Sequence, residues 1–350
     1  NPPAGAPVVG YLEPKAAVGL QRRFGKHVNA TLAYNVQAEI PFGYVGTVDP
    51  NVVPTISLFF PQLTTTFDLR NNPIHPHSGV YLSNDLQTAV IPAGAFLWYD
   101  VRIAPEARFY VPIARDLTLA VKGKLGFLLP VGKDPYGNEY RNDLDQVRAS
   151  DNPNVTKSAE LDRELETVYF RGFFSGGPNS DRGFPLRGIA PHGIVPFLNP
   201  ATGSSQQTNC TVPTSTANTS TGTMTGPQAG SIDLGCSIPI GGFTQWEASV
   251  ELRWDVSGPL GIAFFCDTAD VSENVFEIRP TELHMSCGAG ARYQTPVGPI
   301  RLDVGYRIQP LQVLGKASAA DAYAADHTEG LPQDFLSVPL ALAFGIGEAF

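Results

Sequence analysis

The sequence predicts an all-β fold, a transmembrane antiparallel β-barrel. Three observations lead to this prediction. Segments of strand length alternate between apolar and polar residues, no apolar run reaches the roughly 18 residues of a membrane-spanning helix, and the connections alternate between short and long. A barrel strand turns one face to lipid and the other to a polar lumen, so its residues alternate with a period of two.

The clearest alternation covers residues 243–256, whose apolar face has two tryptophans and whose polar face has Glu251. The next segment, residues 260–268, places Phe264 on its apolar side and Asp267 opposite. Strand parity therefore predicts that Glu251 and Asp267 both point into the lumen. By the same rule, lipid contact is expected at Trp246, Trp254, Phe264, Leu302 and Phe344.

Similar alternation recurs along most of the chain. The further segments that we predict as strands include 28–40, 97–108, 117–127, 300–308 and 338–350. A soluble β-sandwich with its polar face in bulk water is the alternative for any single strand. About twelve long strands with opposite charges on their polar faces favour a barrel with a polar lumen.

The connections between these strands differ in length at the two ends of the predicted barrel. Short turns are expected at 24–27, 111–115, 257–259 and 296–299, and long polar segments at 42–54, 131–164, 188–242 and 309–334. Outer-membrane barrels have short periplasmic turns and longer extracellular loops.

Composition excludes several other functions. The chain has 350 residues, only 16% of them charged, and a formal net charge of -9, which argues against a nucleic-acid partner. No Ser/His/Asp arrangement or nucleotide-binding loop stands out, so neither an enzyme nor a cofactor is predicted. His75 and His77 flank Pro76 without a Cys or Asp at ligand spacing, and we predict no metal site there.

The four cysteines fall into two pairs. Cys210 and Cys236 flank a segment rich in Ser, Thr, Asn and Gly, and a disulfide that closes this loop is expected. Cys266 and Cys287 both point outward on consecutive antiparallel strands, with a turn centred near Phe276, so they can lie opposite each other. They are either bonded or serve as small apolar residues against lipid.

Residues 338–350 form the predicted last strand. Phe344, Ile346 and Phe350 belong to its apolar face, and from 341 to 349 the opposite face has only Ala and Gly. A strand that ends in Phe resembles the targeting signal of outer-membrane barrels. Because small inward side chains pack little, a weak lateral seam is expected at this strand.

Four motifs occur in the order that is typical of one family. They are DLRNNP at 68–73 with Pro76 and Gly79 downstream, FSGG through RGF at 174–184, FFCD at 264–267, and TPVGPIRLD at 295–303. The chain thereby resembles the outer-membrane protein-insertase superfamily, which includes BamA/TamA-like proteins, bacterial surface antigen barrels and two-partner secretion transporters. It departs from the usual motifs by Leu69 in place of Thr and Asp181 in place of Val.

The resemblance implies a 16-stranded barrel domain of which residues 1–350 are the C-terminal portion. Residues 176–242 would be the lid loop and a long extracellular insertion, and no segment resembles the family's POTRA domains or first strands. The implied function is that of an assembly factor in the outer membrane of a Gram-negative bacterium, which inserts and folds β-barrel proteins through a lateral seam. The alternatives are a two-partner-secretion-type translocation pore, or a surface antigen or diffusion porin.

The resemblance also implies the partners: outer-membrane lipid and lipopolysaccharide, unfolded β-barrel client proteins, and periplasmic or lipoprotein accessory subunits. Nucleic acid is not among them.

The RGF motif suggests how a lid would be held. Gly176 and Gly177 permit backbone conformations closed to other residues, so the loop can fold back into the lumen. Arg182 would then present its planar guanidinium to Glu251 and Asp267. Gly183 would allow close approach, and Phe184 would anchor the tip of the loop. The alternative is that Arg182 lies unpaired on an exposed extracellular loop.

Overall fold

A computed structural model describes residues 10–42, 55–93, 96–131, 167–193, 238–296, 298–308 and 338–350. Its strands are β1 (Gly10–Leu12), β2 (Lys15–Phe24), β3 (Val28–Phe42), β4 (Ile56–Asp68), β5 (Gly79–Ala93), β6 (Phe96–Ala114), β7 (Leu117–Val131), β8 (His192–Gly193), β9 (Ile238–Pro239), β10 (Thr244–Ser257), β11 (Leu260–Ser272), β12 (His284–Tyr293), β13 (Ile300–Arg307) and β14 (Leu340–Ile346). Among these residues, no helix has the length and apolar character needed to cross a membrane.

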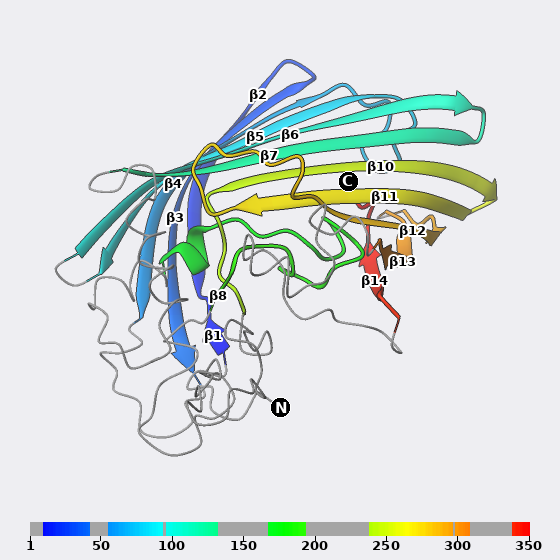
Figure 1. The fold of residues 1–350 in the computed structure, drawn as a ribbon. Coiled ribbons are helices and arrows are strands. Elements are labelled where there is room, and N and C mark those ends of the chain that lie inside the picture. Colours follow the sequence, from blue (N-terminus) through cyan, green and yellow to red (C-terminus); the bar gives the residue numbers. More distant parts are fainter. Residues whose placement is uncertain are drawn as a thin grey trace, which may run out of the picture.

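Twelve strands form one antiparallel sheet, in which neighbours in the chain are neighbours in space. The order runs from β1 through β3 to β7, and then from β10 to β14. β2 continues along the same edge of β3 as β1, because both pair with consecutive parts of that strand. The sheet curves strongly, and residues 167–193 lie on its concave side (Figure 1). In the described residues its two ends do not meet.

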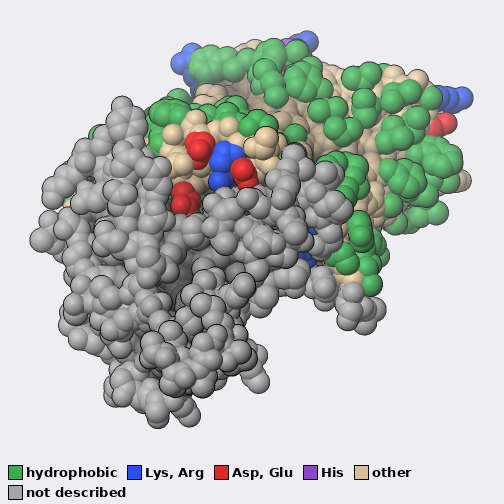
Figure 2. All heavy atoms as spheres, viewed as in Figure 1, with side chains coloured by type: hydrophobic (Ala, Val, Ile, Leu, Met, Phe, Trp, Pro, Cys, Tyr) green, Lys and Arg blue, Asp and Glu red, His purple; other side chains and the backbone are tan. Residues whose placement is uncertain are grey.

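Side chains alternate between the two faces of this sheet, as the sequence predicts. On β11, Phe264 points outward and is 52% exposed, whereas Asp267 is buried on the concave side. Large apolar side chains cover the convex surface (Figure 2). The predictions of an all-β antiparallel fold and of two faces of opposite polarity are therefore confirmed.

The concave side is less uniformly polar than the alternation predicts. Leu58, Ile91 and Leu128 point inward from β4, β5 and β7 and are fully buried against Phe173 and Phe243. These apolar residues tolerate an inward position because the segment at 167–193 covers them and excludes water.

One of the two cysteine pairs lies in the described residues, and there the structure decides between the two alternatives. Cys266 and Cys287 are direct partners in the β11–β12 register, and they form a disulfide. Cys210 and Cys236 lie outside the described residues.

The last strand is shorter than predicted, and the prediction that Phe350 lies on its outward apolar face is wrong. β14 ends at Ile346 because Gly347 has a φ of 92°, which turns the chain off the sheet. Phe344 and Ile346 point outward as expected. Phe350, in contrast, is 4% exposed and packs inside against Tyr110 and Ala120.

We predict that brominated lipids distinguish the tryptophans of the two faces. Trp254 is 48% exposed on the convex face, whereas Trp98 is buried on the concave face and donates to Asp100 at 3.0 Å. In single-tryptophan variants, bromine in the acyl chains should quench Trp254 strongly and Trp98 weakly. Equal quenching would contradict the assignment of the faces.

Candidate functional site

Residues 172–189, which contain the start of the predicted lid loop and are called the lid from here on, form a tight loop on the concave face of the sheet. Gly176 and Gly177 both have positive φ angles, of 95° and 101°. At Gly176 a Cβ atom would lie only 2.4 Å from the carbonyl oxygen of Pro185. A bridge between Ser175 and Ile189 closes the base of the loop. The two glycines therefore let the chain reverse direction where a side chain would not fit.

Arg182 lies at the centre of the lid and is 1% exposed. Its Nε and Nη2 atoms donate to the two carboxylate oxygens of Asp267 at 2.7 and 2.9 Å. Its Nη1 atom donates to Glu251 at 2.5 Å. The guanidinium also stacks on Phe265, with Cζ 3.4 Å from the ring centroid. The structure thus brings Arg182 of the lid together with Glu251 of β10 and Asp267 of the neighbouring strand β11.

The residues after Arg182 fit closely against β12 and β13. The backbone N–H of Gly183 donates to the Ser286 hydroxyl at 3.0 Å, and a Cβ on Gly183 would lie 2.2 Å from the Ser286 Cβ. Phe184 is buried, with the guanidinium of Arg307 over its ring. A glycine is required at 183 because the lid backbone rests directly on the barrel wall.

Further charges surround this contact and balance it. Glu251 also accepts from Arg253 at 2.8 Å, and Asp303 accepts from Arg292 at 2.5 Å. Glu348 lies 3.7 Å from both Arg253 and Arg292. This cluster contains four arginines and four carboxylates. They are Arg182, Arg253, Arg292 and Arg301, and Glu251, Asp267, Asp303 and Glu348. Buried charges are tolerated when each has oppositely charged partners, and this cluster meets that condition.

The lid has additional contacts that the sequence analysis missed. Arg301 donates to the carbonyl oxygen of Pro178 at 2.7 Å and also binds the side chain of Asn179. Lys122 of β7 donates to the Asn179 carbonyl oxygen at 3.0 Å. Strand parity places Lys122 and Arg301 inside, but parity does not show which lid carbonyls they reach.

A carboxylate of β10 completes this side of the lid. Glu247 accepts from Ser175 and Ser180 at 2.8 and 2.6 Å. Strand parity places Glu247 on the polar face of β10, and the two serines are among its partners there.

A second ion pair holds the segment that leads into the lid. Arg171, at the end of a helical turn at 167–171, donates to both oxygens of Asp100 at 3.0 and 2.7 Å and to Gln87 at 2.8 Å. Arg171 and Asp100 are both buried. Strand parity places Gln87 and Asp100 on the inward faces of β5 and β6, but nothing in the local pattern indicates that Arg171 reaches them.

Asp181 is the residue by which this chain departs from the usual lid motif. It is buried, and one of its oxygens accepts from the Ser286 hydroxyl at 2.5 Å. Its other carboxylate oxygen has no hydrogen-bond partner in the described residues. The same oxygen that binds Ser286 also accepts from the Gly183 amide at 3.3 Å. Asp181 thus braces the backbone next to Arg182.

We predict that Arg182→Ala destabilises the folded chain by about 3–5 kcal/mol, because it leaves two buried carboxylates without their shared partner. Urea unfolding in lipid measures this loss. Arg108→Ala is the control, since Arg108 pairs with Glu106 of its own strand and both are partly exposed. That pair should contribute about 1 kcal/mol or less. Equal losses for the two variants would contradict a special role of Arg182.

We also predict that the three residues act as a unit. The double variant Glu251→Gln, Asp267→Asn should add little to the loss caused by Arg182→Ala, since each change disrupts the contacts among these three residues. A double-mutant cycle measures this coupling, and additive losses would reject it.

The comparisons with known proteins agree with the fold and the motifs. The model of the Omp85 superfamily domain matches residues 13–349. Among solved structures, BamA from Haemophilus ducreyi lacking POTRA domains 1-3 is 14% identical, with a TM-score of 0.51. The match covers 91% of this chain and 53% of that chain, so this chain spans about half of its length.

Two further structures have lower similarity. CdiB from Acinetobacter baumannii is 8% identical, with a TM-score of 0.31 over 85% of this chain and 47% of that chain. The KdgM porin in complex with disordered oligogalacturonate is 5% identical, with a TM-score of 0.25 over 85% of this chain and 88% of that chain. No curated protein matches the chain. The fold is that of a BamA-like barrel, and the family match over residues 13–349 shows that the chain belongs to the Omp85 superfamily.

Proposed function

We propose that this chain is an assembly factor in the outer membrane of a Gram-negative bacterium, which inserts and folds β-barrel clients through a lateral seam at β14. Membership of the Omp85 superfamily supports a role in protein insertion or transport. The geometry of β14 is the observation that favours insertion. Its partners would be membrane lipid and unfolded barrel proteins.

β14 is held weakly by its neighbour. It pairs with β13 over seven residue pairs, whereas β5 and β6 pair over fifteen. Its inward residues are Ala341, Ala343 and Gly345, which offer little surface for packing against a closing strand. Its outward residue Phe344 is 67% exposed. A strand with few side-chain contacts depends mainly on its backbone hydrogen bonds for pairing.

This geometry suits an exchange of strands. In hydrocarbon, an unpaired backbone N–H or C=O group costs several kcal/mol, so an open edge of β14 strongly favours pairing with another strand. A client strand can add to that edge by β-augmentation and gain the main-chain hydrogen bonds that lipid does not provide. The mechanism requires no catalytic residue and no nucleotide.

The lid contacts keep the rest of the wall in place during this exchange. Lid residues 177–184 are hydrogen-bonded to β7, β10, β11, β12 and β13. These hydrogen bonds join the lid to the five strands that precede β14 in the sheet. We infer that opening is confined to β14, because the lid connects its neighbours to one another. In the alternative, a secretion-type pore, the lid would have to leave the lumen to let a passenger through.

Photo-crosslinking distinguishes these two routes. Benzoylphenylalanine in place of Phe344 probes the edge, and the same substitution at Phe264, also outward but in the middle of the sheet, is the matched control. A third position, Lys124, probes the lumen. With the chain in liposomes and a urea-denatured barrel client, we expect crosslinks at position 344 alone during client folding. Crosslinks at position 124 without any at position 344 would contradict insertion and support passage through the lumen.

A further inference from the structure

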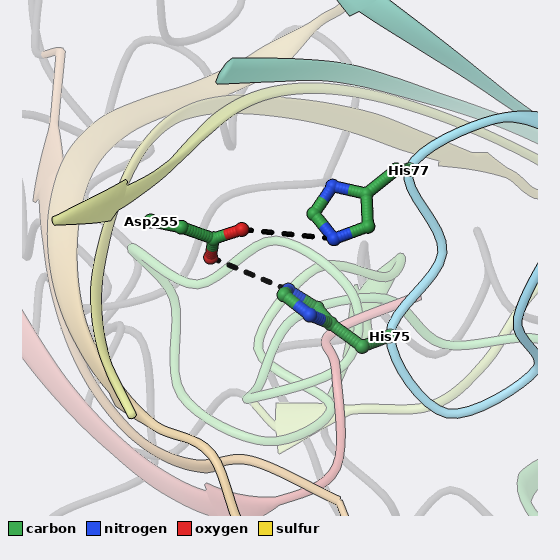
Figure 3. A group of neighbouring side chains, drawn as sticks. All are labelled: His75, His77 and Asp255. Atoms are coloured by element: carbon green, nitrogen blue, oxygen red, sulfur yellow. Dashed lines mark ion pairs between the residues drawn. The ribbon is translucent and has the colours of Figure 1, made fainter. Parts of the chain in front are cut away.

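The turn between β4 and β5 reaches across the sheet to the end of β10. His75 and His77 project from this turn toward Asp255 of β10, although β6 and β7 lie between β5 and β10 in the sheet (Figure 3). His75 Nε2 and His77 Nε2 each lie 3.6 Å from a different oxygen of the Asp255 carboxylate. Two imidazoles and one carboxylate, from segments far apart in the sequence, therefore converge on one point. The sequence predicts no metal site here because no Asp lies at ligand spacing, but the fold brings in the carboxylate of Asp255.

The turn holds the two histidines in fixed positions. The Asn71 side chain accepts from the backbone N–H groups of His77 and Ser78, and that of Asn72 accepts from the N–H of His75 at 3.3 Å. At Gly79, which ends the turn, φ is 115° and a Cβ would lie 2.2 Å from the Leu69 carbonyl oxygen. Residues of the DLRNNP motif and Gly79 thus hold the turn in one conformation and thereby position His75 and His77, which are not part of the motif.

The spacing fits a shared ion better than direct hydrogen bonds. A separation of 3.6 Å is too long for an N–H···O hydrogen bond. In a tetrahedral zinc site with bonds of about 2.0–2.1 Å, the ligand atoms lie about 3.3 Å apart. One atom from each of the three residues falls within 4.8 Å of the others, so a small contraction would bring them to bonding distance.

A contact of His77 favours the metal-binding orientation of its imidazole. His77 Nδ1 lies 2.9 Å from the Thr118 hydroxyl, a contact that can fix the tautomer with its Nε2 lone pair toward Asp255.

Two other groups face His75. Glu348 Oε1 lies 3.9 Å from its Nε2 atom, at a distance from which a carboxylate can become a fourth ligand. The Gln294 amide lies 3.1 Å from the same nitrogen and would have to release it. Arg253 binds the other side of Glu348 at 3.7 Å and partly neutralises it.

We propose that His75, His77 and Asp255, with Glu348 as fourth ligand, bind a divalent transition-metal ion of the zinc class. Two imidazoles and two carboxylates suit zinc better than magnesium or calcium, which prefer oxygen ligands alone. A bound ion would connect the β4–β5 turn to the ends of β10 and of the chain segment after β14. This brace is independent of the seam and of the proposed function.

Calorimetry tests the site directly. The tag-free chain in phosphatidylcholine nanodiscs is treated with EDTA, dialysed into metal-free buffer and titrated with Zn²⁺. We expect saturable binding of one ion per chain, without competition from excess Mg²⁺ or Ca²⁺. Co²⁺ should bind at the same site and show the visible absorption of tetrahedral coordination.

Variants identify the ligands. His75→Ala, His77→Ala and Asp255→Asn should each weaken Zn²⁺ binding by more than about 100-fold, because loss of a direct ligand exceeds the 10–100-fold effect of an outer-shell partner. His27→Ala is the matched control, since His27 lies in the exposed β2–β3 turn and its ring is hydrogen-bonded to the Asp68 carbonyl oxygen at 2.9 Å, away from Asp255. Its affinity should be unchanged.

Three outcomes would overturn the proposal: no saturable binding, equal weakening by His27→Ala, or retained affinity in both His75→Ala and His77→Ala. Heat-modifiable migration in electrophoresis verifies that each variant is folded. If His75→Ala or His77→Ala does not fold, His75→Gln or His77→Gln replaces it, because glutamine keeps a polar side chain at that position.

Discussion

The guanidinium of Arg182 is the contact on which the interior of this protein depends. It is fully buried, and it joins the lid to Asp267 and Glu251 on two neighbouring strands. A buried charge without partners would be very costly, so the lid and the two carboxylates require one another. The glycines at 176 and 177 and the close fit of Gly183 serve to place this one side chain.

The lid also determines what the barrel interior contains. On β4 to β7 it covers a group of inward apolar residues, as at Leu58 and Leu128, beside polar ones such as Asp100 and Lys122. Where it meets β10 to β13, many of the inward residues are charged, as at Glu251 and Asp303. A lumen that was simply filled with water would favour polar side chains throughout. The mixture is consistent with a lid that is a permanent part of the fold, next to a last strand that has little packing of its own.

Much of this arrangement follows from strand periodicity. A period of two fixes the face of every residue once one is known, so Glu251 and Asp267 could be placed inside before any coordinates. The same rule, with a turn centred near Phe276, placed Cys266 opposite Cys287, and the two are bonded. Family motifs added Arg182, whose position on a loop has no periodicity.

The features that the sequence did not predict depend on paths of the chain outside regular strands. The contact of Arg171 with Asp100 requires the course of the helical turn. Phe350 was assigned to the outer face because the alternation was extended past Gly347, where a positive φ ends the strand. The group of His75, His77 and Asp255 forms only because one turn extends over two strands, which no local pattern reports.

Hydrogen exchange in the lid tests the central claim most directly. The backbone N–H groups of Arg182 and Gly183 donate to Asp267 and Ser286 inside the barrel. In the chain reconstituted in lipid, these two amides should exchange as slowly as those of β10 and β11, and Arg182→Ala should make them exchange rapidly. Rapid exchange of both amides in the unaltered chain would show that the lid is not held in the lumen and would contradict the account.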